Sequence, residues 1–354
     1  MQIESDHIEL LSGVRAGETI GSPIAMLIRN HDWRNWQDIM SPAPLDGESV
    51  HSGARKRAVT RPRPGHADLA GMLKYDRSDA RDILERASAR ETTARVAAGA
   101  VCRVLLTLLD VSIGSHIVAL GDIQARAPES LPADLNAAAD ASPLRTLDGD
   151  AEARMIALID EAKRSGDTLG GICEVVVRGL PVGLGSHVAW DRKLDGKLAA
   201  AVMSIPAVKG VEIGIGFQAA RLPGSQVHDE IDPAEDAVTR GRLSRRTNNA
   251  GGLEGGITTG EPLVLRVAMK PISTLMRPLA SIEMSTRESA ASTVERSDVT
   301  AVPAMGVIAE AMTAFVLANA VLEKFGGDSL KEILRNRDGY LQYLAKRDTG
   351  RDAA

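Results

Sequence analysis

The chain has 354 residues, a formal net charge of −5 and 44% hydrophobic residues, but only 3% aromatic residues. This length and composition allow a sizeable aliphatic core, whereas the acidic balance and the scarcity of aromatics disfavour nucleic-acid binding. No uninterrupted apolar run reaches the roughly eighteen residues of a membrane helix. Cys102 and Cys173 each lie in an apolar stretch, which indicates buried thiols rather than a zinc site.

The first part of the chain predicts short strands followed by a long loop. Apolar and polar residues alternate over residues 1–30, and Gly13 and Gly17 interrupt the pattern. Residues 31–76 have little periodicity and many Pro, Gly, Arg and His residues, which is typical of a functional loop. His31, Trp33 and Trp36 within it are interpreted as a local packing cluster.

The remainder mixes helices and strands without regular alternation. Helical spacing predicts helices at about 79–109, 151–163, 194–203, 304–324 and 329–346. Apolar runs rich in β-branched residues predict strands at 111–120, 170–179, 208–217 and 263–270. Residues 123–147 and 222–260 are expected to be irregular. This order indicates an α+β fold in a single domain, 1–354, with a frayed tail at 347–354.

The segment RPRPGHAD at 61–68 is the first candidate for chemistry. Its prolines stiffen the backbone and its glycine allows a turn, so that Arg61, Arg63 and His66 are held at short range. Guanidinium groups bind carboxylates and phosphates through two hydrogen bonds, and an imidazole exchanges protons near neutral pH. The segment predicts a site for a multiply anionic ligand, with a solvated basic loop or a nucleic-acid patch as alternatives.

Four further segments are ambiguous when each is taken alone. Arg86 and Arg90 have helical spacing and would share a face, as in a ligand site or a surface charge ladder. The glycines of residues 247–260 could wrap an anion or a flavin edge, or form a flexible loop. Lys270 with the hydroxyls of Ser273 and Thr274 suits a phosphate, or an ordinary turn. In residues 295–298, an arginine could bind an anion and an aspartate could accept a proton.

The trio His228, Asp229 and Glu230 has the residue types of a metal or acid/base site. It lies in a polar stretch, and no second histidine has the spacing of a metal ligand. The trio is therefore given little functional weight.

Taken together and in this order, six segments resemble the chorismate synthase family. They are RPRPGHAD at 61–68, ERASARETTARVAAGAV at 85–101, IPAVKGVEIGIGF at 205–217, NNAGGLEGGITTG at 248–260, KPIST at 270–274 and RSDVTAVP at 296–303. The resemblance implies a sandwich of helices between antiparallel sheets. It also implies a cytoplasmic lyase of the shikimate pathway, which serves aromatic amino acid biosynthesis. The implied reaction is a 1,4-anti elimination of phosphate from 5-enolpyruvylshikimate 3-phosphate, with reduced FMN as cofactor.

The resemblance also assigns roles to individual residues and partners. His66 and Asp298 match catalytic positions, and Arg63, Ala89 and Arg90 match substrate-binding positions. The positions that match the FMN site are Arg86, Ala87, Ser88, Pro206, Ala207, Gly255, Lys270, Pro271, Ile272, Ser273, Thr274 and Arg296. The implied assembly is a homotetramer, with NADP as an associated nucleotide, an external flavin reductase as partner, and no metal, nucleic acid or membrane.

One departure from the family pattern leaves alternatives open. Family members begin with a strand and a GESHG-type motif that carries a second histidine, and this sequence shows neither. We therefore expect an N-terminal truncation relative to the family. The alternatives to an active lyase are a catalytically impaired remnant that binds flavin or anions, and a basic-loop module that binds nucleic acid or protein.

Overall fold

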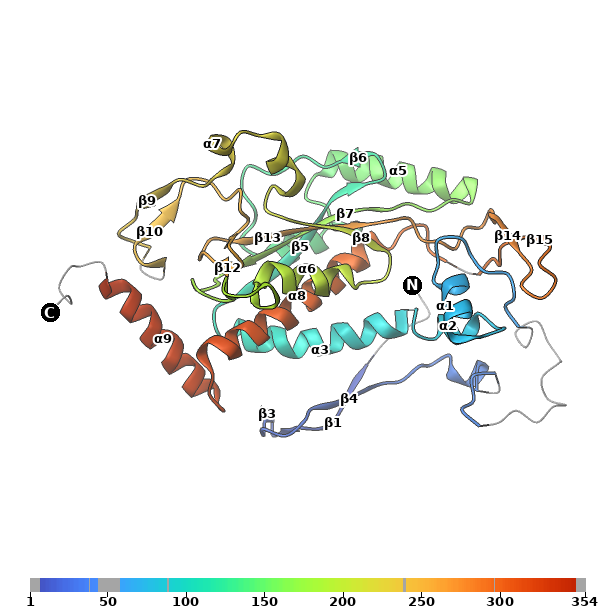
Figure 1. Cartoon of the computed structure of the whole chain (residues 1–354), viewed down its shortest axis with the longest axis horizontal. Coiled ribbons are helices and arrows are strands. Elements are labelled where there is room, and N and C mark those ends of the chain that lie inside the picture. Colours follow the sequence, from blue (N-terminus) through green and yellow to red (C-terminus); the bar gives the residue numbers. More distant parts are fainter. Residues whose placement is uncertain are drawn as a thin grey trace. The chain divides into compact units, whose positions relative to one another are not determined.

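The computed structural model describes residues 7–37, 39–43, 58–87, 89–237, 240–295 and 297–347, which form two compact units. Unit 1 is drawn from Met1–Ala97 and Pro278–Glu295, and unit 2 from Ala98–Arg277 and Arg296–Ala354. Helices and antiparallel strands occur in both (Figure 1), which confirms the α+β class. The expected frayed tail lies outside the described residues apart from Arg347, and the expected single domain stays a prediction.

Unit 1 begins with the short strands that the alternating pattern predicts. Strand β1 (Ile8–Ser12) pairs antiparallel with β4 (Ala25–Ile28), and β2 (Val14–Arg15) pairs with β3 (Glu18–Thr19). A single 3-10 turn, η1 (Trp33–Asn35), follows. The indole N–H of Trp36 donates to Asp32 at 2.6 Å, so a hydrogen bond anchors this aromatic segment.

The rest of unit 1 is built on a small core. Its elements are α1 (Asp68–Tyr75), α2 (Arg81–Leu84) and an antiparallel hairpin of β14 (Ala280–Ile282) and β15 (Ser289–Ala291). Val59, Met72 and Ala80 form the buried core, and Ile83 and Met284 pack against it. The hairpin thus shares a core with segments about 200 residues away in sequence.

The expected long helix from residue 79 is wrong at its start. Helix α2 ends at Leu84, and α3 (Ala89–Thr107) begins after a turn. The Asp79 carboxylate accepts hydrogen bonds from the backbone N–H groups of Val59 and Arg81, both at 2.9 Å. These hydrogen bonds hold the backbone just before α2 begins, whereas the break between the two helices falls later, between Leu84 and Ala89.

Unit 2 contains an antiparallel sheet of five strands in the order β6-β5-β7-β13-β8. These strands are β5 (Ser112–Leu120), β6 (Ile123–Gln124), β7 (Gly171–Arg178), β8 (Val208–Ile213) and β13 (Leu263–Met269). Strand β8 ends before residue 217, where it was expected to end, because Gly214 and Gly216 adopt positive φ and lead into η5 (Gly216–Arg221). The other predicted strands are confirmed to within one or two residues.

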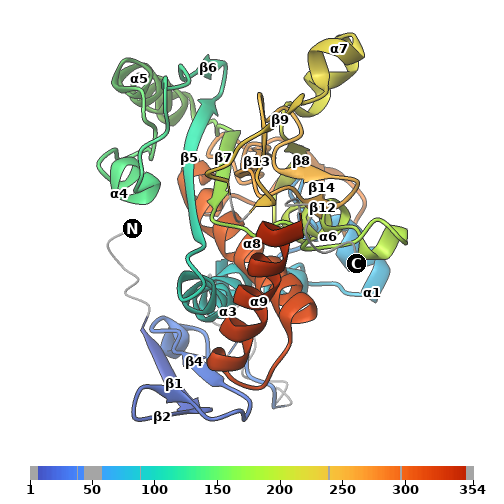
Figure 2. The ribbon, with the colours of Figure 1, turned by 90° about the vertical axis from the view of Figure 1, so that its left-hand side faces the viewer.

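Helix α8 (Val302–Phe325) packs on one face of this sheet, against β5 and β7. Its Gly306 lies beside Ser115 and Cys173. Helix α4 (Leu135–Asp140) covers the other face of β5, where Gly114 leaves room for Leu135. Figure 2 shows α4 and α8 on opposite sides of β5. The sheet is therefore enclosed at β5, which explains why most of this strand is buried.

The remaining helices and short elements of unit 2 complete its core. Helices α5 (Gly149–Ser165), α6 (Leu194–Met203) and α9 (Leu330–Arg347) confirm three predicted helices. The stretches expected to be irregular contain α4, β6 and several short elements. The latter are α7 (Gly224–Val227), β9 (Ile231–Pro233), β10 (Leu243–Arg245), β11 (Leu253–Glu254) and β12 (Ile257–Thr258). A further 3-10 turn, η4 (Trp190–Arg192), precedes α6.

Helix α8 is long and apolar enough to cross a membrane, with a mean hydropathy of 1.8 over its most apolar stretch. However, 67% of that stretch is buried inside the molecule, as in the core helix of a globular unit. Within unit 2 it also packs on α3 so tightly that a Cβ at Gly99 would lie 2.5 Å from the Ala311 Cβ. These contacts account for its apolar sequence without a bilayer.

Polar groups close the part of the β5 edge that does not pair with β6. Asn136 accepts from the Ser115 N–H at 3.1 Å and donates to the Ile113 carbonyl at 3.2 Å. Glu310 of α8 is 2% exposed and accepts from Ser115, Asn136, Arg103 and Arg145. This cluster satisfies backbone groups that an open strand edge would leave unpaired.

Both cysteines are free thiols, and the expected burial is confirmed for Cys173 but not for Cys102. Cys173 is buried, and burial raises the pKa of its thiol to about 12. Cys102 is partly buried, and burial raises its pKa as well. Neither thiol therefore has the lowered pKa of a reactive cysteine.

Candidate functional site

A tight turn forms the centre of the candidate site in unit 1. The His66 N–H donates to the Arg63 carbonyl at 3.2 Å, which closes a turn over Pro64 and Gly65. Proline fixes φ at the second position of such a turn, and glycine accepts the positive φ of the third, here +76°. The sequence thus determines a turn that carries His66 back beside Arg63 and leads into α1 at Asp68.

The segment before this turn lies along the β14–β15 hairpin. Its carbonyl groups accept hydrogen bonds from the Met284 N–H to Thr60 at 3.0 Å, and from the Ser281 hydroxyl to Pro62 at 2.6 Å. The Thr293 hydroxyl donates to the Arg61 carbonyl at 2.9 Å. Because Pro62 has no N–H, its carbonyl is the only backbone group there that needs a partner. The hairpin therefore fixes the backbone that carries the candidate residues.

The carboxylate of Asp68 ties the turn together from inside. Asp68 is fully buried, and Arg63 is 6% exposed. Asp68 accepts from the Arg63 backbone N–H at 3.0 Å, from Arg63 Nε at 2.9 Å and from Arg63 Nη2 at 3.1 Å. Its second oxygen, Oδ1, lies 2.5 Å from His66 Nδ1. His66 keeps 20% of its side chain exposed, so its ring is held on one side and open on the other.

The charge on Asp68 is stabilised by these donors. Burial by itself raises the pKa of this carboxyl group, but the hydrogen bonds from His66 and Arg63 outweigh burial. The pKa of Asp68 therefore lies well below its usual range. An ionised carboxylate has no proton to donate, so the hydrogen between Asp68 and His66 belongs to His66 Nδ1.

The second predicted segment of unit 1 is only partly described. Arg86 is exposed and precedes α3, so the expectation that Arg86 and Arg90 share one helix face is wrong. The Ala87 N–H donates to the Leu84 carbonyl at 3.1 Å, and Arg90 forms an ion pair with Glu85. Ala89 begins α3. Ser88 lies outside the described residues.

In unit 2, two predicted segments meet at one end of the sheet. Lys270 follows β13 and Ala207 precedes β8, and the Lys270 N–H donates to the Ala207 carbonyl at 3.0 Å. The Lys270 ammonium donates to the Ser273 hydroxyl at 2.7 Å. Pro206 and Pro271 are exposed, Ile272 is partly buried and Thr274 is buried. The antiparallel pairing of β8 and β13 is what brings these segments together.

The loop before β7 holds two site segments at once. The Thr168 hydroxyl donates to the Ile272 carbonyl at 2.7 Å, and the Leu169 N–H donates to the Val299 carbonyl at 2.8 Å. A Cβ at Gly170 would lie 2.3 Å from the Met269 carbonyl oxygen, so only glycine fits there. Asp298 precedes Val299 and is exposed. The loop therefore places Asp298 at the same end of the sheet as Lys270, whereas Arg296 lies outside the described residues.

Lys270 carries a charge that the described residues do not neutralise. Burial lowers the pKa of Lys270, and the positive charge of Lys209 lowers it further. Among residues 7–347 outside the gaps, no carboxylate forms an ion pair with Lys270. Two cations and two hydroxyl groups at one strand end are suited to an anion, above all to a phosphate group.

Gly255 lies elsewhere in unit 2. It forms the turn between β11 and β12, with φ +59°, and the nearest atom to its hypothetical Cβ is the His187 Cβ at 3.8 Å. The Gly256 carbonyl accepts from the Leu194 N–H at the start of α6, whereas Ala207 comes after the end of that helix. Ten helical residues span about 15 Å, so one chain does not bring Gly255 next to Ala207.

The trio at 228–230 has a structural role. Asp229 accepts from the Thr247 hydroxyl and from the backbone N–H groups of Asn249 at 2.8 Å and Ala250 at 2.9 Å. Burial raises the pKa of Asp229, but these hydrogen bonds outweigh it and lower the pKa overall. No cluster that could hold a metal ion occurs in the part of the chain that the structure describes. Asp229 thus fixes the shape of the glycine-rich loop.

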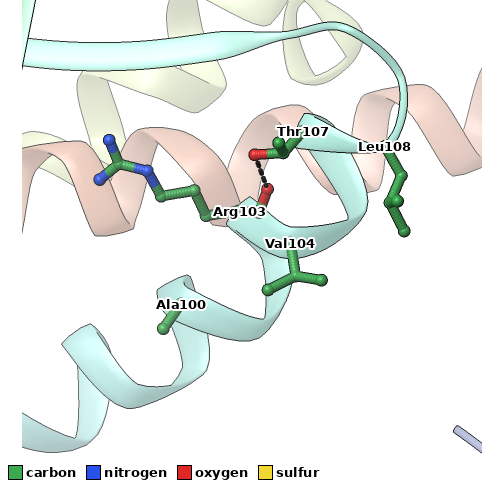
Figure 3. A pocket seen from close by; sticks show the side chains of 5 residues that line it. All are labelled: Ala100, Arg103, Val104, Thr107 and Leu108. Atoms are coloured by element: carbon green, nitrogen blue, oxygen red, sulfur yellow. Dashed lines mark hydrogen bonds between the residues drawn. The ribbon is translucent and has the colours of Figure 1, made fainter. Parts of the chain in front are cut away.

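A hollow of about 320 Å³ lies on the outer surface of α3 (Figure 3). Ala100, Arg103, Val104, Thr107 and Leu108 line it. The Arg103 guanidinium is already bound to Glu310, and the hollow contains none of the residues predicted for the site. It is an apolar surface depression and not the candidate active site.

Comparison with known proteins decides the family. The family model for chorismate synthase matches residues 1–322. The chain belongs to the chorismate synthase family. The chorismate synthase of Symbiobacterium thermophilum is 57% identical over 348 residues, which cover 98% of this chain and 88% of that protein. The chorismate synthase of Geobacter sulfurreducens is 56% identical over 347 residues, covering 97% of this chain and 87% of that protein.

The fold comparison agrees with the family. A solved crystal structure of a chorismate synthase matches with a TM-score of 0.75 and 41% sequence identity, covering 96% of this chain and 85% of that chain. The comparisons do not bear out the expected N-terminal truncation, and they extend over 88% and 87% of the length of these two relatives. No finding supports the alternative of an impaired remnant, since identity near 55% extends over nearly the whole chain.

Sequence reasoning missed two residues at these sites. Asp68 is the last residue of the motif RPRPGHAD, and its position at the start of α1, where a carboxylate is favourable, could have indicated a role. Lys209 lies one residue into β8 and faces Lys270 only because β8 pairs with β13. Pairing between strands that are distant in sequence leaves no local pattern, so Lys209 could not have been found.

Proposed function

We propose that the chain converts 5-enolpyruvylshikimate 3-phosphate into chorismate by 1,4-anti elimination of phosphate, with reduced FMN as its cofactor. The observation that supports this most is the cationic strand end of unit 2. Lys270 has a lowered pKa and a hydroxyl partner at 2.7 Å, but no carboxylate partner among the described residues. A flavin phosphate would supply the missing negative charge.

The residues present fit this cofactor. Lys270, Ser273 and Thr274 would hold the phosphate, and Lys209 would add a second positive charge. Ala207 contributes a carbonyl to the same strand end and has a φ of +67°. When bound, reduced FMN supplies electron density to the breaking C–O bond and recovers it, so that no net redox change occurs. Pro206, Pro271 and Ile272 complete the proposed FMN contacts in this segment.

The proposed roles of the protein's own groups follow from their chemistry. His66 has an exposed ring edge and exchanges a proton with the reacting ligands through Nε2. Arg63 and Arg90 balance the negative charge of the substrate, whose carboxylates and phosphate are suited to guanidinium groups. Arg90 is held by an exposed ion pair with Glu85, which a substrate carboxylate can replace at little cost. Asp298 accepts a proton at its exposed carboxylate.

Several further assignments remain proposals that rest on the family. They are the substrate contact at Ala89, the FMN contacts at Arg86, Ala87, Ser88, Gly255 and Arg296, the single domain, and the convergence of all these residues on one flavin. We also propose a cytoplasmic homotetramer that obtains reduced flavin from an external reductase. Light scattering should give about four times the mass of one chain. A monomer at micromolar concentration would contradict the assembly.

The experiment that tests the function is an anaerobic assay with the pure protein and chemically reduced FMN. We expect one phosphate and one chorismate per substrate consumed, with the FMN still reduced at the end. Oxidised FMN should give no product. Binding of FMN without phosphate release would favour the impaired remnant, and salt-sensitive binding of nucleic acid without FMN affinity would favour the interaction module.

A further inference from the structure

The fully buried carboxylate of Asp68 contacts both Arg63 and His66 of the candidate site. It accepts three hydrogen bonds from Arg63, including one from its backbone, and one from His66 Nδ1. A buried charge is costly unless several donors compensate it. Here all the donors belong to Arg63 and His66, the first and last residues of the turn.

We propose that Asp68 is a positioning residue that sets the tautomer and orientation of His66 for proton transfer. Its Oδ1 lies 2.5 Å from His66 Nδ1, and its Oδ2 is occupied by Arg63. Because the carboxylate can only accept, Nδ1 carries the proton and the lone pair of the neutral ring is on Nε2. The inference rests on the proposed function, since it concerns how His66 performs its part in that reaction.

Arg63 in turn holds the carboxylate of Asp68 in place. Its guanidinium is planar and makes two parallel contacts, Nε to Oδ2 at 2.9 Å and Nη2 to Oδ1 at 3.1 Å. These contacts prevent the carboxylate from rotating. The same Nη2 lies 3.2 Å from His66 Nδ1 and 3.5 Å from Nε2, so it contacts the ring beside both nitrogens. With Nδ1 committed to Asp68, Nε2 is the ring nitrogen that can accept a proton.

The substitution Asp68→Asn reverses this arrangement with almost no change in shape. The Asn oxygen would remain with the Arg63 backbone N–H and Nε, whereas its NH₂ group would replace Oδ1, lose the bond from Arg63 Nη2 and point at His66 Nδ1. An NH₂ group can only donate, so the imidazole proton would move to Nε2. In serine proteases the equivalent change, from aspartate to asparagine, produces the wrong tautomer and lowers kcat about 10⁴-fold.

The direct test is nitrogen NMR of the full-length protein labelled with ¹⁵N in its histidine rings. The chain has 7 histidines, and the His66 signals are those that disappear in His66→Gln. We expect the wild-type protein to carry its neutral His66 proton on Nδ1 and Asp68→Asn to carry it on Nε2. A wild-type His66 protonated on Nε2 would overturn the proposal without any variant being needed.

Kinetics provide the second test. We expect Asp68→Asn to lower kcat by about 10²- to 10⁴-fold, with KM changed by less than about threefold. If Asp68 acts through His66, the double variant His66→Gln/Asp68→Asn should be no slower than His66→Gln. Independent, multiplicative losses in the double variant would overturn the proposal.

The matched control is Glu283→Gln in the same unit. Glu283 accepts from the Thr60 hydroxyl at 2.8 Å and from Arg61, so it supports the same backbone segment without touching His66. This variant should keep the wild-type tautomer and a kcat within about threefold. Equal losses in both variants would show a merely structural role. A wild-type protein that releases no phosphate would refute the proposed function but leave the tautomer result standing.

Discussion

The surroundings of single charges distinguish the two candidate clusters. Asp68 is buried and surrounded by donors, so its charge is fully compensated inside the protein. Lys270 is also partly removed from water, but its only described partners are a neutral hydroxyl and a second cation. The charges around Asp68 are balanced without a ligand, whereas those around Lys270 are balanced only when an anion binds.

Replacing Lys270 should therefore weaken the binding of flavin phosphate specifically. A hydrogen bond to a charged group contributes about 1.5–3 kcal/mol, so we expect Lys270→Met to raise the Kd of FMN about 10- to 100-fold. The affinity for riboflavin, which lacks the phosphate, should stay the same. Fluorescence titration of both ligands measures the difference.

The control for this variant is Lys197→Met. Lys197 forms an exposed ion pair with Glu323, 3.3 Å away, and takes no part in the strand-end cluster. Its removal should leave the Kd of FMN within about twofold of the wild-type value. If Lys270→Met reduced the affinities for FMN and riboflavin equally, the phosphate assignment would be wrong.

For single residues, the sequence correctly predicted the features that depend on adjacent residues. Pro64 and Gly65 predict a turn, and the turn is there. Arg63 was predicted as a ligand contact, but its pairing with Asp68 was not foreseen, because the motif does not show which charges will be buried together. The strand-end site was foreseen at Lys270 and missed at Lys209, which depends on strand pairing.

At the scale of elements, hydrophobic periodicity predicted the long helices and central strands well. Helix α6 has the predicted bounds, and α8 exceeds its prediction by only a few residues. The failures occur where one side chain or one backbone contact overrides a regular pattern. The helix expected from residue 79 is interrupted between Leu84 and Ala89, and Gly214 ends β8 early. A single sequence shows these residues but not the partners that give them their effect.

The buried cluster around Glu310 makes a prediction at this scale. Glu310→Gln would remove the buried carboxylate that Arg103 and Arg145 share, so that Arg145 would keep only its ion pair with Asp140. We expect a cost of about 1.5–3 kcal/mol, the usual contribution of a hydrogen bond to a charged group, because Arg103 is 39% exposed and Arg145 keeps Asp140. Urea unfolding should show a loss of this size in the free energy of unfolding of unit 2.

An exposed acidic residue on the same helix serves as the comparison. Glu323 pairs with Arg192 and Lys197 at the surface. Glu323→Gln should cost less than about 1 kcal/mol, because water screens exposed ion pairs. Equal losses for the two substitutions would mean that Glu310 does not close the edge of β5 in the way described.

For the whole molecule, several carboxylates have lowered pKa values, and this fixes the direction of acid sensitivity. For Asp68 and Glu174, burial alone raises the pKa, but hydrogen bonds from His66 and Arg63 to Asp68, and from His116 and Arg266 to Glu174, lower it overall. In the unfolded chain these groups titrate near 3.8 and 4.5. Their contribution to stability is therefore present above about pH 4.5 and is lost as the pH falls through their folded-state values.

We accordingly expect the midpoint of thermal unfolding to be nearly constant from about pH 7 to about pH 5 and to fall steeply below about pH 4. Differential scanning calorimetry at constant ionic strength measures this. The substitution Asp68→Asn should reduce the steepness, since one titrating group is removed. A midpoint that rises on acidification would show that other groups dominate.

The loop at residues 168–170 is bonded to two segments of the proposed site. Thr168 holds the segment of Lys270 and Ser273, and Leu169 holds the segment that contains Asp298. A cofactor bound to the first segment would therefore lie at a fixed distance from the second. Inserting one residue into this loop would move the segment of Lys270 away from the proton acceptor Asp298, although each segment would itself be unchanged.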